Sequence, residues 1–312
     1  MNNTSVFPEH NQINFENENL VDESLNLPMK PYLLLILFIQ ALLSTVGNLI
    51  ICLMTITMPT LRKNMCVYFI LCFSFSDLLF GSATIDHYFQ SNLDDIPLWR
   101  CLITTTVSLS AFLISLAQAF LICLERTLHI LYFPRSSSLL TDKNRTFIVV
   151  GTWVFCVVYI CVLVASRDCS LKERTVEDFL SSCTSVVNGV YALFAPLYIG
   201  VVFQYLYLLY KVKKLQTSVR NLKSNQQNQS EATVQNSSLE LFRNIFKTVS
   251  VFVVTYVVSF SPMLMLFSEN AFTGNFNREM FALVVILLGL NGLISPLLYI
   301  WRFKDVRRLF EC

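Results

Sequence analysis

Three ionisable side chains lie where the surrounding apolar sequence makes their charge costly. Asp77 interrupts the run SFSFSDLLFG, and Glu125–Arg126 follows an uncharged stretch that begins at Cys101. A charge inside a bilayer costs on the order of several kcal/mol, so each such residue needs a partner or a task. Asp77 indicates either a protonated carboxyl that hydrogen-bonds for packing or a water-lined cation or proton site. Glu125 and Arg126 indicate either a functional pair or two charges that extend to the membrane interface.

The chain lacks the residue combinations that catalysis requires. Its histidines, His10, His87 and His129, are scattered, and no nucleophile elbow, phosphate-binding loop or zinc motif is present. The ten cysteines show no metal-ligand spacing, and most lie within apolar stretches as small buried residues. The sequence therefore predicts neither an enzyme nor a structural metal site, and no nucleic-acid partner is expected.

Seven long apolar stretches must position these residues. Residues of the AVILMFWYC set make up 54% of the chain and charged residues 14%, which is typical of a polytopic membrane protein. Lipid offers the backbone no hydrogen bonds, and the stretches reach roughly 20 residues without alternating in polarity, so they are expected to be helices rather than barrel strands. The predicted fold is an all-α, seven-transmembrane helix bundle over residues 31–301. The expected helices cover residues 31–58, 65–89, 99–131, 146–166, 184–212, 240–268 and 279–301.

The distribution of basic residues predicts the orientation of this bundle. Sixteen Lys and Arg residues flank one side and six flank the other, and the richer side is expected in the cytoplasm. The acidic segment 1–30, with glycosylation sequons at Asn2 and Asn3, is then extracellular and disordered, and the C-terminus is cytoplasmic. We therefore expect a multi-pass protein of the plasma membrane.

Two cytoplasmic segments have distinct predictions. Residues 214–238 are rich in Gln, Asn and Ser without periodicity, which favours a flexible third cytoplasmic loop. Residues 302–312 place Phe303, Val306 and Phe310 at helical spacing among basic residues, which predicts a short amphipathic helix on the inner leaflet. Cys312 is either a palmitoylation site or an unmodified thiol. Pro196, Pro262 and Pro296 are expected to kink three successive membrane helices.

Markers in each helix resemble those of the rhodopsin-like (class A) G-protein-coupled receptors. The resemblance covers the chain from about residue 31 to its end, and Arg126 follows Cys101 by the family's 25 residues. In chain order the markers are Gly47–Asn48, Asp77, Cys101, Arg126, Trp153, Pro196, Pro262, and Pro296 with Tyr299 in SPLLY.

The resemblance implies roles for several of these residues. Glu125, Arg126 and Tyr299 take the places of the switch at the G-protein-binding face, which opens when helix six moves outward. Asp77, Ser115, Asn291 and Ser295 match an internal sodium and water pocket. Cys101 is expected to form a disulfide with Cys169 or Cys183. The implied partners are an extracellular ligand, a heterotrimeric G protein and arrestin.

Some positions depart from the family pattern. Thr127 replaces the tyrosine after the arginine, Phe260 replaces the helix-six tryptophan, and Ser295 replaces asparagine and is a poorer sodium ligand. These departures keep open an atypical or scavenging receptor that does not couple to a G protein. A transporter or channel is a further alternative, but no internal repeat or continuous polar path supports it.

The expected ligand pocket has few hydrogen-bonding groups. Ser108 stands where amine receptors hold an aspartate, and Gly289 stands where opsins hold the retinal lysine, so neither a biogenic amine nor retinal is expected. No cofactor is expected, apart from the allosteric sodium ion that the resemblance allows. The mostly apolar lining predicts a small apolar ligand, odorant-like or lipid-derived. Asp86 and His87 are either contacts for a cationic or peptide ligand or simply exposed. The predicted lining residues are Ser108, Leu109, Phe112, Asn188, Ala192, Phe260, Met263, Leu264, Phe267 and Val285.

Overall fold

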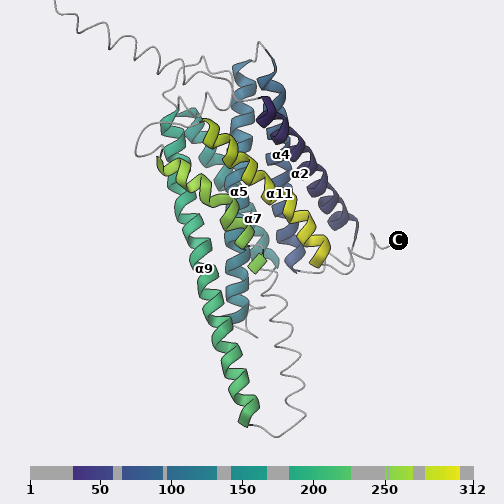
Figure 1. The fold of residues 1–312 in the computed structure, drawn as a ribbon, viewed down its shortest axis with the longest axis vertical. Helices are drawn as coiled ribbons and strands as arrows, with labels where there is room; N and C mark the ends of the chain where they lie inside the picture. The colour runs from purple at the N-terminus through teal and green to yellow at the C-terminus, as the bar shows by residue number, and fades with distance from the viewer. Residues whose placement is uncertain are drawn as a thin grey trace, which may run out of the picture.

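The structure, a computed structural model, describes seven helices. It covers residues 31–58, 65–93, 97–131, 142–166, 183–225, 250–251, 253–269 and 278–302. Six of the helices carry labels in Figure 1, and a shorter one, Val253–Glu269, precedes α11 in the chain. The labelled helices are α2 (Pro31–Thr57), α4 (Met65–Ser91), α5 (Leu98–Leu131), α7 (Asp142–Ala165), α9 (Thr184–Asn225) and α11 (Arg278–Arg302).

Length and composition make these helices suitable for a bilayer. Within the described residues, α2, α5, α7, α9 and α11 each contain a span long and apolar enough to cross a membrane. At 1.5 Å per residue, the 27 residues of α2 or α4 extend about 40 Å. Large apolar side chains face outward along α2 and α7, including Leu43, Phe147 and Val162. An apolar outer surface of this kind is stable only in contact with lipid or another apolar partner.

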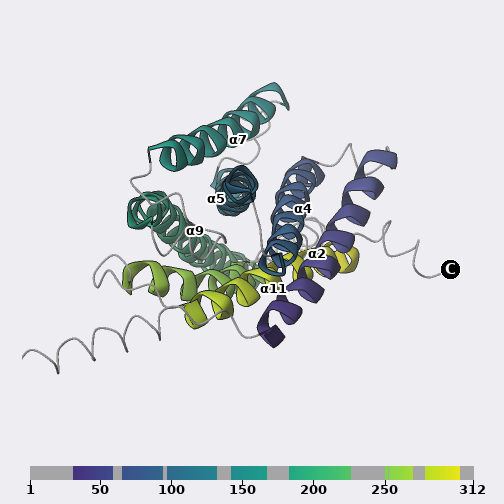
Figure 2. The same ribbon diagram turned by 90° about the horizontal axis from the view of Figure 1, so that it is seen from above.

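α5 is the central helix of the bundle (Figure 2). It contacts α4, α7 and α9, whereas α2 packs against α4 and α11. Every side chain from Leu109 to Ala119 on α5 is buried. Because α5 is surrounded on all sides, residues on any of its faces can contribute to an internal site.

Small residues allow α2 to approach its neighbours closely. A Cβ atom added at Gly81 of α4 would collide with the Thr45 hydroxyl of α2, and one added at Gly292 of α11 would collide with the Ser44 hydroxyl. Glycine at these positions lets the helix backbones approach where lipid gives no hydrophobic driving force for association. Close packing of α2 thus fixes the positions of α4 and α11, which carry most of the sites described below.

The prolines expected to kink membrane helices lie inside helices. At Pro296, another residue replaces the backbone hydrogen bond that proline removes. Pro296 lies within α11, and because proline has no N–H it cannot donate to the carbonyl of Gly292, four residues earlier. The fully buried Asn48 of α2 donates from Nδ2 to that carbonyl at 3.0 Å. Asn48 therefore replaces the hydrogen bond that Pro296 removes. Pro196 likewise lies inside a helix, α9.

Two boundaries of the labelled helices differ from the sequence prediction by more than two residues. α7 begins at Asp142 rather than at residue 146, and α9 continues to Asn225 rather than ending at residue 212. The helix thus replaces the first part of the predicted flexible loop, residues 214–225, and α9 projects past the bundle in Figure 1. This segment contains Lys, Leu, Gln and Arg, which favour helix, and no Gly or Pro. The predictions for residues 1–30, 240–249 and 303–312, including the amphipathic helix, lie outside the described residues.

Candidate functional site

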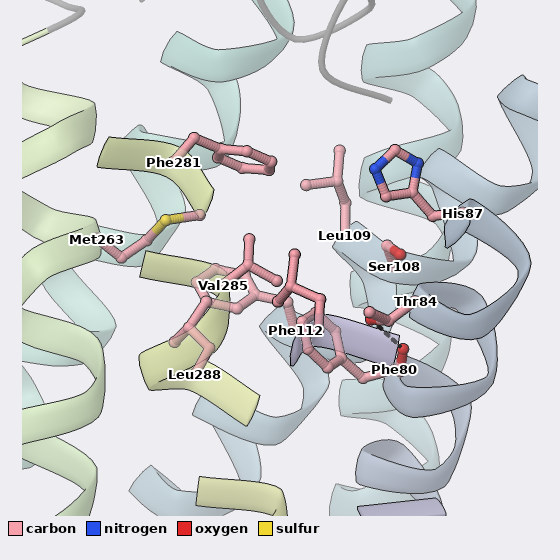
Figure 3. A pocket seen from close by; sticks show the side chains of 11 residues that line it. Phe80, Thr84, His87, Ser108, Leu109, Phe112, Met263, Phe281, Val285 and Leu288 are labelled. Atoms are coloured by element: carbon pink, nitrogen blue, oxygen red, sulfur yellow. Dashed lines mark hydrogen bonds between the residues drawn. The ribbon is translucent and has the colours of Figure 1, made fainter. Parts of the chain in front are cut away.

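A mostly apolar cavity lies between α4, α5, α11 and the Val253–Glu269 helix (Figure 3). The cavity is near the end of the bundle that carries Arg100. We call this end the Arg100 end, and the opposite end, which carries Tyr299, the Tyr299 end. Five of the predicted lining residues surround it: Ser108, Leu109, Phe112, Met263 and Val285. The predicted lining did not include six others, of which His87 was considered only as a contact for a cationic or peptide ligand: Leu37, Phe80, Thr84, His87, Phe281 and Leu288.

The other predicted lining residues lie elsewhere. Phe260 and Phe267 are buried in the aromatic core and Leu264 is half-buried, whereas Asn188 and Ala192 are exposed on α9. The buried face of α9 is set by Val190 and Phe194, and a residue two positions away points about 200° around the helix. Asn188 and Ala192 therefore lie on the opposite face from the core.

The sequence does contain a pattern that indicates the α4 wall of the cavity, which was left out of the predicted lining. Phe80, Thr84 and His87 follow one another at intervals of four and three residues, which places them on one face of α4. Two polar residues on such a face of a membrane helix indicate an internal site. A second, smaller cavity adjoins this wall and shares Leu37, Phe80, Thr84 and Val285 with the first. It is also lined by Gln40, whose Nε2 donates to the Ile286 carbonyl of α11 at 2.6 Å.

A hydrogen-bonded cluster joins α4 and α5 at the Arg100 end. Arg100 Nη2 lies 2.5 Å from Asp86 Oδ1, and the side chains of both residues are about one-third exposed. Thr104 Oγ1 donates to Asp86 Oδ2 at 2.5 Å and Gln90 Nε2 donates to the same oxygen at 2.6 Å. The negative charge of Asp86 is therefore compensated inside the protein, which disfavours its use in binding a cationic ligand.

Aromatic side chains connect the cavity to the middle of the bundle. Phe112, which lines the cavity, stacks on Phe260 with ring centroids 5.5 Å apart. Phe260 in turn stacks on the fully buried Tyr256 at 4.0 Å. Phe194 of α9 stacks on Phe112 at 5.3 Å. These four rings, the aromatic column, link α5, α9 and the Val253–Glu269 helix below the cavity.

The four residues of the predicted sodium pocket are buried, and two of them are hydrogen-bonded across helices. Ser115 Oγ donates to Asp77 Oδ1 at 3.3 Å, and both residues are buried. Asp77 Oδ2 has no hydrogen-bond partner among the described residues. Asn291 and Ser295 are also buried, but the Ser295 hydroxyl donates to the Asn291 carbonyl at 2.8 Å within its own helix. A buried carboxylate oxygen of this kind is a group that a proton or a small cation stabilises.

The predicted switch residues lie towards the Tyr299 end. Glu125 is buried, and Thr127 donates to the Cys123 carbonyl at 2.9 Å. The backbone of Arg126 belongs to α5, but its side chain lies outside the described residues. Tyr299 is buried, and its hydroxyl has no hydrogen-bond partner in the described part of the chain. The roles of Glu125, Arg126 and Tyr299 stay predictions.

The extracellular cysteine prediction is tested only in part by the described residues. Cys183 is disulfide-bonded, and Cys101 is buried in the same hydrophobic cluster. Cys169, Cys312 and the sequon residues Asn2 and Asn3 lie outside the described residues. The pairing of Cys101 therefore stays a prediction. No group of three or more His, Cys, Asp or Glu side chains within the described ranges is arranged to hold a metal ion.

Comparison with known proteins agrees with this architecture. Residues 47–299 match the sequence model of the 7 transmembrane receptor (rhodopsin family). No curated protein matches the chain. The match runs from the Gly47–Asn48 pair to Tyr299 and includes all of the markers discussed above between those residues. The chain belongs to the rhodopsin family of seven-transmembrane receptors.

Proposed function

We propose that this receptor binds a small, mostly apolar extracellular ligand in the cavity and activates a heterotrimeric G protein. Phe112 carries the proposal, because it is both a wall of the cavity and a member of the aromatic column. A ligand that packs against Phe112 changes the stacking of Phe260, which belongs to the Val253–Glu269 helix. The cavity is thus in direct contact with the helix that must move outward.

The mechanism is a shift between two arrangements of packed helices. A ligand shifts such an equilibrium only by its difference in affinity for the two states. We propose that the active state separates the Val253–Glu269 helix from α5 at the Tyr299 end, with Pro262 as the hinge. This movement frees Arg126, beside Glu125, for the G protein, while Tyr299 turns inward. Arrestin is the second partner proposed for the same face.

The orientation follows from charge. We propose that the Arg100 end is extracellular and that the Tyr299 end, with the basic continuation of α9 through Lys211, Lys213 and Lys214, is cytoplasmic. The cavity then lies nearer the extracellular side of a plasma membrane, where an apolar ligand arrives from solution or from the outer leaflet.

We further propose that Asp77 forms a site for sodium or a proton. The partnerless Oδ2 atom supports this assignment, because a cation there compensates a buried charge. Ser115 and Ser295 would contribute hydroxyl oxygens and Asn291 an amide oxygen. When bound, the ion would supply positive charge that favours one helix arrangement.

The decisive experiment compares two variants in cells that carry a promiscuous G-protein reporter. We expect Arg126→Ala to abolish the ligand-dependent signal at unchanged surface expression, and Phe112→Ala to weaken ligand potency at least tenfold. Phe203→Ala is the matched control, because Phe203 is 71% exposed on α9 and lies outside the cavity. Full signalling by Arg126→Ala contradicts the coupling proposal. Specific ligand binding without any G-protein signal in the wild type favours the atypical receptor instead.

A further inference from the structure

The polar side chains that line the cavity all lie on one side of it, among the apolar side chains of Phe80, Leu109 and Phe112. Thr84, His87 and Ser108 lie on the α4 and α5 side, whereas Met263, Phe281 and Val285 face them from the Val253–Glu269 helix and α11 (Figure 3). No Lys, Arg, Asp or Glu is among the described residues that line it. The nearby carboxylate, Asp86, is already held by Arg100, Gln90 and Thr104. Apart from the imidazole of His87, no lining side chain among the described residues can carry a charge, so a ligand with a net charge would lose its hydration here without meeting a permanent opposite charge.

The hydroxyl groups of Thr84 and Ser108, on the polar side of the cavity, differ in their hydrogen bonding. Thr84 Oγ1 donates to the Phe80 carbonyl at 2.9 Å, the usual arrangement of a hydroxyl inside a helix. Ser108 makes no such bond: its hydroxyl forms no hydrogen bond within the described part of the chain, and the residue is half-buried at the cavity. Its proton is therefore available to an acceptor atom that enters the cavity.

We propose that the ligand is an uncharged, mostly apolar molecule with one hydrogen-bond acceptor oxygen, such as a ketone or an ester, held by the Ser108 hydroxyl. The apolar part of the ligand lies against Met263, Phe281 and Val285. This assignment rests on the proposed function of the cavity and adds the chemical class of its ligand. It separates neutral carbonyl compounds from hydrocarbons, carboxylates and amines of the same size.

The test uses full-length receptor in lipid nanodiscs and ligand-observed NMR, with empty nanodiscs as the correction for partition into lipid. The probes are linear and cyclic ketones, including 2-heptanone and cyclooctanone. Each is paired with the hydrocarbon in which a methylidene group replaces the carbonyl oxygen. Heptanoate and heptylamine supply the charged comparisons.

We expect ketones to bind wild type more tightly than their hydrocarbon partners, and Ser108→Ala to remove this preference. One neutral hydrogen bond corresponds to a loss of about 3- to 10-fold in ketone affinity. Ser110→Ala is the matched control, because Ser110 is buried on the same helix, has a hydroxyl without a partner in the described residues and does not line the cavity. Ser110→Ala should leave the preference for ketones unchanged.

Several outcomes overturn the assignment. One is equal binding of ketones and hydrocarbons to wild type. Others are an equal loss of both probes in Ser108→Ala, tighter binding of heptanoate or heptylamine, and no specific binding by any ketone. A parallel nucleotide-exchange assay separates this failure from failure of the proposed function. Ketone binding that depends on Ser108 but gives no exchange supports the ligand class and contradicts signalling. Activation by a ligand of another class supports signalling and contradicts the proposed ligand class.

Discussion

Asp86 and Asp77 belong to the same helix, about two and a half turns apart, and their surroundings differ sharply. Asp86, at the Arg100 end, accepts hydrogen bonds from Arg100, Gln90 and Thr104. Asp77, deep in the bundle, accepts one bond at 3.3 Å from Ser115, and its second oxygen has no partner among the described residues. The difference indicates a fixed polar clamp beside the cavity and an incompletely satisfied polar layer beneath it.

This contrast agrees with the proposed function, in which the ligand cavity keeps its shape while the helices rearrange nearer the Tyr299 end. The Asp86 carboxylate accepts hydrogen bonds at both oxygens and would lose them in any rearrangement, so this network keeps α4 and α5 together. Buried groups without partners lose nothing when neighbouring helices move, and they gain from an ion, a water or a new side chain. We therefore expect conformational change to concentrate at the level of Asp77 and Tyr299 rather than at the clamp.

The largest effect is expected from a substitution that breaks the aromatic column between the cavity and the interior of the bundle. Phe260→Ala removes a ring that is 3% exposed and stacked against Phe112, Phe194 and Tyr256. Such a truncation costs about 3–5 kcal/mol of stability in a packed core. The melting temperature of the purified receptor should fall clearly, and ligand-dependent signalling should be lost. Phe203→Ala, at the exposed surface of α9, should melt close to wild type, and an equal loss in both variants would contradict the role of the column.

The next prediction compares Asp77 with Asp86 by the effect of each substitution on the melting temperature and on its response to sodium. Because Asp77 Oδ2 has no partner in the described residues, Asp77→Asn removes a charge whose burial costs at least about 1–3 kcal/mol. In choline chloride the variant should melt higher than wild type. Sodium chloride should raise the melting temperature of wild type but not of Asp77→Asn.

Asp86→Asn is the control for the sodium experiment, because Arg100 already compensates Asp86. It should keep the response of wild type to sodium. An unchanged sodium response in Asp77→Asn, or its loss in Asp86→Asn, would show that the deep carboxylate is not the ion site.

A third prediction concerns the hydrogen bond that compensates Pro296. Asn48→Leu leaves the Gly292 carbonyl without its donor, at a cost of about 1–3 kcal/mol. Pro296→Ala restores a backbone N–H to that carbonyl, so the same leucine substitution should cost less in the Pro296→Ala background. A double-mutant cycle of melting temperatures measures this coupling. Additive losses would refute the compensation.

The smallest expected effect concerns the clamp itself. Arg100 and Asp86 are each about one-third exposed, so solvent screens their attraction. A double-mutant cycle with Arg100→Gln and Asp86→Asn should give a coupling energy of about 0.5–1 kcal/mol that decreases with added salt. A coupling that does not depend on salt would place the clamp in a more enclosed environment than the structure shows.

The seven helices and the family were accessible from sequence because their signals are local. A run of apolar residues fixes a membrane helix whatever its neighbours are, and the markers from Asn48 to Tyr299 occur in a fixed order. Seven helices and membership of the rhodopsin family are confirmed. The continuation of α9 to Asn225 was missed because a polar composition was given more weight than the absence of helix-breaking residues.

The cavity was only half accessible from sequence. Ser108, Leu109 and Phe112 were predicted, whereas Phe80 and Thr84 were not. His87 was considered only as a contact for a cationic or peptide ligand, and Asn188 and Ala192 face away from the cavity. Which face of a helix points inward depends on its rotation about its own axis. In an apolar helix the sequence specifies that rotation weakly, because outward and inward faces are both apolar.

Length, charge and composition along single segments were enough to predict the helices, their orientation and the ionisable residues within them. The contacts between polar groups became known from the three-dimensional structure. Arg100 pairs with Asp86, Asn48 donates to the Gly292 carbonyl, and the Ser108 hydroxyl lies at the cavity without a hydrogen bond in the described residues. These pairings depend on helix rotation and on approaches of a few ångströms between helices. Packing of small residues against neighbouring helices sets those approaches.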